Sequence, residues 1–169
     1  MAISNYSGSV PTFIQLLGGL KGVLTKLEAH ATEKKWDMAV VLNQRFYPDM
    51  FTLERQVRQA CVHAQGAGRV AGVTLPSLPD EDKSYADMQA RIDKVIDFNK
   101  GLSAAAIDGK EDSEVTLVQG GNERKLKAQA YLYHTAMPNF YFHTTTAYNI
   151  IRSLGVDLGK RDFMGQAPS

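Results

Sequence analysis

One histidine near the end of the chain lies on an apolar helical stripe, and its imidazole ring is the strongest candidate for chemistry. His143 shares a helix face with apolar residues spaced by whole turns, namely Phe140, Ala147, Ile150 and Leu154. A buried polar group that has no partner costs about 1–3 kcal/mol. We therefore expect the ring of His143 to meet a metal ion, a bound ligand or a hydrogen-bonding group of the protein.

Two other polar side chains are placed to join His143. Asn139 lies four residues earlier and so faces the same side of the helix. His63 lies on the flank of an earlier apolar stripe, beside Gln56 and Gln59. If the two helices are antiparallel, a rise of ~1.5 Å per residue puts His63 roughly 12 Å and Asn139 roughly 16 Å from the same end. These heights allow His63, Asn139 and His143 to form one site.

The donor atoms of this trio leave two interpretations open. Imidazole suits zinc, nickel, iron and copper, and a catalytic zinc ion usually has three protein ligands and one open position. Here two histidines and one amide are available, and asparagine is a poor ligand for a transition metal. The trio is therefore either a metal or ligand site, or a set of hydrogen-bonded residues at a helix interface. No residue is assigned a catalytic role, and whether the protein is an enzyme stays open.

Other patterns give weaker grounds for catalysis. Cys61 and His63 are two residues apart, which places them about 200° apart on a helix, so no cysteine–histidine dyad is expected. We expect Cys61 to be a small core residue. The segment Gly66-Ala67-Gly68 does not follow a strand, and it is therefore not a phosphate-binding loop.

Length and composition are those of an ordinary globular protein. The 169 residues can bury a sizeable core, and we expect a single domain over residues 1–169. The formal net charge is +1 without a basic stripe, so no nucleic-acid partner is expected. No run approaches the roughly 20 apolar residues of a membrane span, so no membrane partner is expected. The single cysteine and the absence of a signal-peptide pattern predict a cytoplasmic protein.

The candidate residues lie on two of four long helical patterns. These patterns cover residues 10–30, 48–71, 85–105 and 128–154. They predict an all-α four-helix bundle in which Pro138 kinks the last helix. Residues 114–127 alternate weakly around a glycine pair, which indicates a short β-hairpin between the third and fourth helices. The connection 72–80 is longer than an antiparallel turn needs, so the second and third helices are expected to be parallel.

Several segments together resemble one uncharacterised bacterial family, a domain of unknown function. They are the block Pro138-Asn139-Phe140-Tyr141-Phe142-His143 with its continuation to Gly155, the helix entry Arg45–Met50, the stretch Gln56–Ala64 and the ending Gly155–Gly165. The resemblance covers essentially the whole chain and is to a family of the DinB-like (DinB/YfiT-type) superfamily. It implies an up-down-down-up four-helix bundle that is often dimeric, so we expect a homodimer.

The resemblance also implies roles for the three candidate residues. Many members of the superfamily bind a divalent metal, commonly nickel or zinc, through a histidine on helix two and an H-x-x-x-H pair on helix four. Some members are thiol-dependent transferases or isomerases. His63 matches the helix-two ligand and His143 matches the second residue of the pair. Asn139 stands where the first is expected, so a nickel or zinc ion is expected to be weakly bound or absent.

Two functions from different classes are consistent with these features. The first is a DinB-like protein with a degenerate metal or small-molecule pocket between helices two and four, lined by His63, Asn139 and His143. The alternative is a metal-free helical bundle that acts as a dimerisation or partner-binding module. A separation of His63 and His143 under about 5 Å, with a cavity between them, would favour the first. A filled, dry interface or a large exposed apolar helix face would favour the second.

Overall fold

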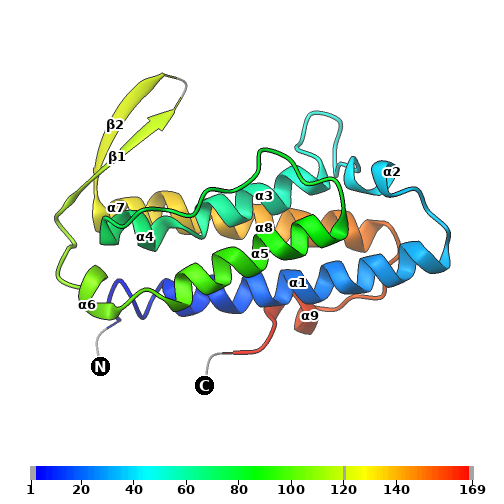
Figure 1. The fold of residues 1–169 in the computed structure, drawn as a ribbon, viewed down its shortest axis with the longest axis horizontal. Coiled ribbons are helices and arrows are strands. Elements are labelled where there is room, and N and C mark those ends of the chain that lie inside the picture. Colours follow the sequence, from blue (N-terminus) through cyan, green and yellow to red (C-terminus); the bar gives the residue numbers. More distant parts are fainter. Residues whose placement is uncertain (1–2, 120, 168–169) are drawn as a thin grey trace.

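Helices make up most of the fold, and one hairpin stands beside them (Figure 1). The computed structural model describes residues 3–119 and 121–167. In chain order the elements are α1 (Val10–Glu33), α2 (Met38–Leu42), α3 (Leu53–His63), α4 (Gly66–Ala71), α5 (Tyr85–Lys100), α6 (Ala104–Ile107), β1 (Glu114–Gln119), β2 (Asn122–Lys127), α7 (Ala128–Tyr131), the π-helix η1 (Leu132–Ala136), α8 (Met137–Ser153) and α9 (Lys160–Met164). The predicted helical fold with one short hairpin is therefore confirmed.

The four long helices α1, α3, α5 and α8 surround one apolar core. Each of α1 and α3 packs against both α5 and α8. In the core, the rings of Phe13 and Phe140 meet edge to face with their centroids 4.9 Å apart, and both side chains are fully buried. Burying a side chain of this size contributes about 1.5–3 kcal/mol to folding. The apolar stripes of the sequence thus hold α1 against the helix that carries His143.

Contacts along α3 and α5 show that these two helices run in the same direction. The start of α3 lies beside the residues that precede α5, because the backbone N–H of Asp82 donates to the carboxylate of Glu54 at 3.3 Å. The ends also meet, because Asn99 donates to the carbonyl of Ala64 at 3.0 Å. In Figure 1, α1 and α8 run in the opposite direction to this pair.

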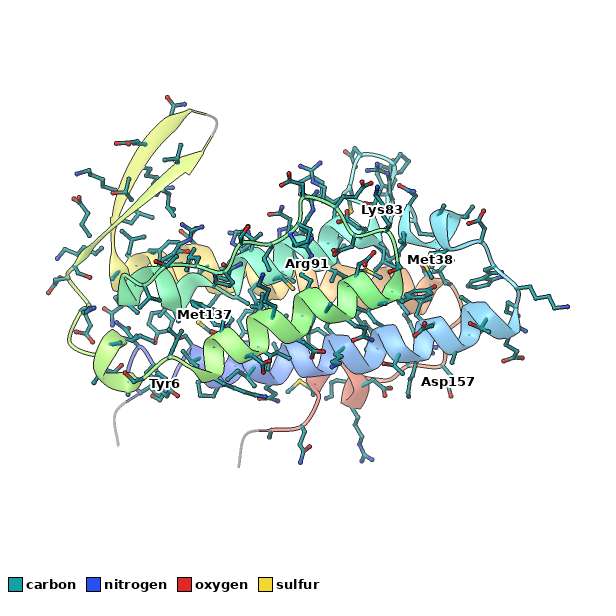
Figure 2. All side chains as sticks on the ribbon, in the orientation of Figure 1. Tyr6, Met38, Lys83, Arg91, Met137 and Asp157 are labelled. Atoms are coloured by element: carbon teal, nitrogen blue, oxygen red, sulfur yellow. The ribbon has the colours of Figure 1, made fainter. Side chains whose placement is uncertain are left out.

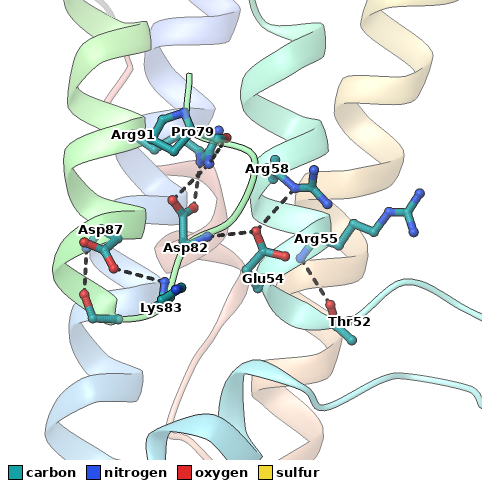
Figure 3. A network of polar contacts seen from close by, with 10 residues as sticks. Thr52, Glu54, Arg55, Arg58, Pro79, Asp82, Lys83, Asp87 and Arg91 are labelled. Carbon is teal, nitrogen blue, oxygen red and sulfur yellow. Dashed lines mark hydrogen bonds and ion pairs between the residues drawn. The ribbon is translucent and has the colours of Figure 1, made fainter. Parts of the chain in front are cut away.

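The long connection between α4 and α5 is fastened to the bundle by a buried ion pair (Figure 3). Arg91 on α5 donates to both carboxylate oxygens of Asp82 at 2.6 and 2.9 Å, and to the carbonyl of Pro79 at 2.7 Å. In Figure 2 the side chain of Arg91 points from α5 toward this connection. Removing one partner of a buried pair leaves an uncompensated charge, which costs about 3–5 kcal/mol. The pair therefore fixes the path of the chain along the bundle.

The second helical segment is shorter and more broken than predicted. It begins at Leu53 rather than at Pro48, because Thr52 acts as the N-cap and accepts a hydrogen bond from the N–H of Arg55 at 3.3 Å. It also does not run unbroken to Ala71, since α3 ends at His63 and α4 forms a separate helix. The predicted continuous helix over 48–71 is therefore wrong at its start and in its middle.

The first and third helical patterns match the structure more closely. The first helix continues past its predicted end at residue 30 to Glu33. The third begins as expected, with the hydroxyl of Ser84 accepting from the N–H of Asp87 at 3.1 Å, but it ends at Lys100 rather than near residue 105. The hairpin is confirmed as an antiparallel pair with Glu114 opposite Lys127. The predicted turn residue Gly120 lies outside the described residues.

The last helical segment contains a π-helix where a proline kink was predicted. Pro138 has no N–H to donate to the carbonyl four residues before it. The chain accommodates this with the π-helix η1, in which the N–H of Met137 donates to the carbonyl of Leu132, five residues earlier. Within the described part of the chain, no helix combines the length and apolar composition needed to span a membrane.

Candidate functional site

The three residues singled out in the sequence line one cavity between α3 and α8. His63, Asn139 and His143 all face this cavity, whose volume is about 440 Å³. The hairpin closes one side through Leu117 and Val118 of β1. Cavities of about 300–1,000 Å³ are typical of small-molecule sites. The structure therefore brings together residues that lie 80 positions apart in the sequence, at a volume suited to a small ligand.

A chain of hydrogen bonds sets the orientation of the His143 ring. Gln56 on α3 donates from Nε2 to the carbonyl of Phe51 at 3.3 Å, which turns its Oε1 toward His143. His143 Nδ1 then donates to this oxygen at 2.7 Å. Because Nδ1 carries the proton, Nε2 of the neutral ring keeps its lone pair. His143 thus has the protein hydrogen-bond partner that its burial requires, and one nitrogen remains able to accept a proton or bind a ligand.

His63 lies beside His143 in a nearly parallel orientation. The two ring centroids are 5.5 Å apart, and the ring planes differ by 9°. Burial lowers the pKa of His63 to about 4, and the positive charge of Arg69 adds to this effect. Burial also lowers the pKa of His143 to about 4, with a smaller contribution from His63. Both rings are therefore neutral at pH 7, and each offers one unprotonated nitrogen.

One side of the cavity is a stripe of residues spaced by four along the last helical segment. The stripe consists of Tyr131, Thr135, Asn139 and His143. In a regular α-helix, residues four apart drift around the axis by about 40° per step. The π-helix between Leu132 and Ala136 winds more slowly and reduces this drift. The π-helix before Pro138 therefore helps to keep these four side chains on the same cavity.

The donor set does not fit a metal centre with three protein ligands. Asn139 donates from Nδ2 to the carbonyl of Thr135 at 2.7 Å, so only its amide oxygen is left as a ligand. Amide oxygen suits magnesium or calcium better than nickel or zinc. Over residues 3–119 and 121–167, no three His, Cys, Asp or Glu side chains gather in a group that could hold a metal ion. The site offers two imidazole nitrogens and one weak oxygen ligand.

The sequence interpretation missed one charged residue and the hairpin wall. Arg69 on α4 lines the cavity, and so do the hairpin residues Leu117 and Val118. The break between α3 and α4 changes the direction in which Arg69 faces, so helical spacing from His63 could not place it. The spacing of four from Tyr131 to His143 was a usable signal, but only its last two members were recognised.

The only cysteine in the sequence is excluded from this chemistry. Cys61 is completely buried in the core, as expected, and burial raises the pKa of its thiol to about 12. A thiol with such a pKa carries almost no thiolate at neutral pH, so it is inert as a nucleophile. The polar groups of the cavity remain as the candidates for binding.

Comparisons with known proteins agree with the fold. Residues 5–164 match a domain of unknown function (DUF1993). The chain is also similar to a DinB family member protein from Shewanella denitrificans, whose crystal structure is known. The two chains are 36% identical with a TM-score of 0.85, over 97% of this chain and 93% of the other. The comparison with curated proteins gave no match.

Proposed function

This chain belongs to the DUF1993 family, a domain of unknown function with a DinB-like fold, and we propose that the cavity between α3 and α8 is its binding site. The observation that carries the proposal is the pairing of His63 with His143, at 5.5 Å between ring centroids, in the wall of one cavity of about 440 Å³. Two neutral imidazoles in the wall of a cavity of this size are suited to bind a small molecule.

We propose that a divalent metal is bound weakly at this site or not at all. The support is the donor set, because position 139 supplies an amide where an H-x-x-x-H pair would supply a second imidazole on α8. A nickel or zinc ion held by two histidines lacks the third protein ligand that catalytic zinc sites usually have. The pocket is therefore degenerate as a metal centre while it remains open to a small molecule.

Elemental analysis of protein purified without a histidine tag tests this proposal. We expect less than about one equivalent of nickel or zinc after dialysis, because a site with two imidazoles exchanges its metal. His143→Ala serves as the matched variant, since it removes one of the two imidazoles. Stoichiometric metal that survives dialysis in the wild-type protein, and is lost in His143→Ala, would contradict the degenerate site.

The arrangement of the helices and the assembly complete the proposal. The up-down-down-up order is supported by the parallel course of α3 and α5 and by the long connection that returns along the bundle (Figure 1).

We also propose a homodimer in the cytoplasm. The dimer is supported by four exposed aromatic side chains, Phe46, Tyr47, Tyr141 and Phe142. The cytoplasmic location is supported by the free cysteine Cys61.

Sedimentation velocity tests whether the protein is a homodimer. The same experiment tests the alternative function, in which the helical bundle acts as a dimerisation or partner-binding module. A chain of 18.6 kDa should sediment at twice that mass, because exposed aromatic side chains are typical of subunit interfaces. A single species of 18.6 kDa at all concentrations would contradict the homodimer and would leave the ligand site unaffected.

A further inference from the structure

The cavity between α3 and α8 has an unbalanced charge. Arg69 is the charged residue in its lining, and among the residues that the structure describes no aspartate or glutamate lines the same space. The other polar groups of the wall are neutral amides, hydroxyls and imidazoles, the last because burial keeps both histidines unprotonated at pH 7. A ligand that enters this cavity therefore meets a positive charge without a counter-charge.

The guanidinium of Arg69 is not engaged by any other residue that the structure describes. Across the part of the chain that the structure describes, its side chain takes part in no ion pair or hydrogen bond. Glu114 shares an adjacent cavity with Arg69, but its carboxylate pairs with Lys125 at 2.7 Å. Arg69 lines the cavity and is itself exposed, so a dissolved ligand can reach its charge. Arginine binds carboxylate and phosphate groups through two parallel hydrogen bonds.

We propose that the cavity selects a small organic anion, whose carboxylate or phosphate group pairs with Arg69 while its apolar part lies against the hairpin and Phe51. This assignment rests on the proposed function, because it names the class of ligand for the same site. The apolar contacts are supplied by Phe51, Val62, Leu117 and Val118. The ligand is thus an amphipathic acid with one anionic end.

Matched acids and amides test the assignment, because each pair differs in charge and hardly in shape. Benzoate with benzamide, and hexanoate with hexanamide, are titrated into metal-free protein while the ring-proton NMR signals of His63 and His143 are followed. We expect both acids to shift these signals and to bind at least about tenfold more tightly than their amides, since charge-assisted hydrogen bonds are about twice as strong as neutral ones. Equal affinities for acid and amide would overturn the assignment.

Arg69→Gln and Arg161→Gln are the matched variants. Each removes one exposed positive charge, but Arg161 lies on α9, which packs against α1, away from the cavity. In Arg69→Gln the ratio of the affinity for the acid to that for its amide should fall to about one. In Arg161→Gln this ratio should remain at about ten. A preference that survives in Arg69→Gln would overturn the assignment. Circular dichroism spectra equal to that of the wild type confirm that both variants are folded.

The same titrations separate this inference from the proposed function. If acids and amides shift the histidine signals with equal affinity, the cavity is a ligand site that does not select anions, so the inference fails alone. If neither the four probes nor zinc shift the signals of His63 and His143, the cavity binds nothing of these classes, and both statements fail.

Discussion

His143 is held in one protonation state by its surroundings. Gln56 fixes the proton on Nδ1, the ring of Phe51 lies nearly parallel to it with centroids 6.1 Å apart, and Phe142 meets its edge at 5.3 Å. Only about 6% of the residue's surface is exposed. An imidazolium ion here would have lost most of its hydration, and this is why burial is the largest cause of its low pKa.

The low pKa of His143 makes stability depend on pH. Its pKa lies near 4 in the folded protein and near 6.5 in the unfolded chain, so the unfolded state takes up a proton first as the pH falls. The contribution of neutral His143 to the unfolding free energy is fully present above about pH 6.5 and is lost progressively as the pH falls toward 4. At pH 5 the unfolding free energy should be lower by about 1–2 kcal/mol for this histidine.

Urea unfolding at pH 7 and pH 5 measures this loss. His143→Asn is the matched variant, because its amide nitrogen can still donate to Gln56 but does not titrate. The variant should lose less stability than the wild type between the two pH values. If both proteins lose the same amount, His143 is not the group responsible.

At the scale of residues, sequence reasoning found one side of the site. The spacing of Asn139 and His143 follows from helical periodicity alone, and the structure places both on the cavity. Arg69 could not be found in this way. The helix is interrupted after His63, so helical periodicity along α3 does not carry over to α4. Gln56 was noticed only as a neighbour of His63, since its bond to His143 depends on how two helices are rotated against each other.

At the scale of elements, the glycines of α1 serve different purposes. Gly19 is buried against α9, and a Cβ at this position would lie 2.3 Å from the carbonyl oxygen of Phe163. Gly18 and Gly22 are exposed and have no such neighbour within 4 Å. Close packing therefore explains Gly19 and allows α9 to lie against α1. No contact in the structure explains why positions 18 and 22 are glycine.

Substitution by alanine distinguishes these roles. Gly19→Ala should lower the unfolding free energy by about 1–3 kcal/mol, because the methyl group overlaps the backbone of α9. Gly22→Ala should raise it by up to about 1 kcal/mol, because alanine favours a helix and nothing obstructs it. Chemical denaturation gives both values. A Gly19→Ala protein as stable as Gly22→Ala would show that the approach of α9 is not tight.

The elements that were predicted well are those whose signals are local. The cap of α5 at Ser84 and the hairpin at 114–127 depend on neighbouring residues, and both are present. The start of α3 was misplaced because Pro48 suits a first helical turn as well, while Thr52 provides the cap that the backbone uses. The π-helix before Pro138 was not predicted, because a proline within a helix more often produces a kink.

At the scale of the whole molecule, apolar periodicity was sufficient to predict a helical bundle with one hairpin. The family resemblance then agreed with the match over residues 5–164. The cavity itself could not be predicted, because its wall combines residues of α3, α4, the hairpin and the last helical segment. Such long-range arrangements leave no periodic signal in a single sequence.

We propose that the cavity is a three-ligand metal site in which position 139 has lost its ligand. Asn139→His restores this ligand on the face that already holds His143, opposite His63 on α3. Three imidazoles supply the protein ligands that a zinc ion with one open position requires. The direct measurement is calorimetric titration of zinc into metal-free wild-type protein, Asn139→His and the double variant Asn139→His/His143→Ala. We predict that Asn139→His binds one zinc ion per chain at least about tenfold more tightly than the wild type, and that the double variant loses this gain. Tight stoichiometric binding by the wild type, or no gain in Asn139→His, would contradict the claim.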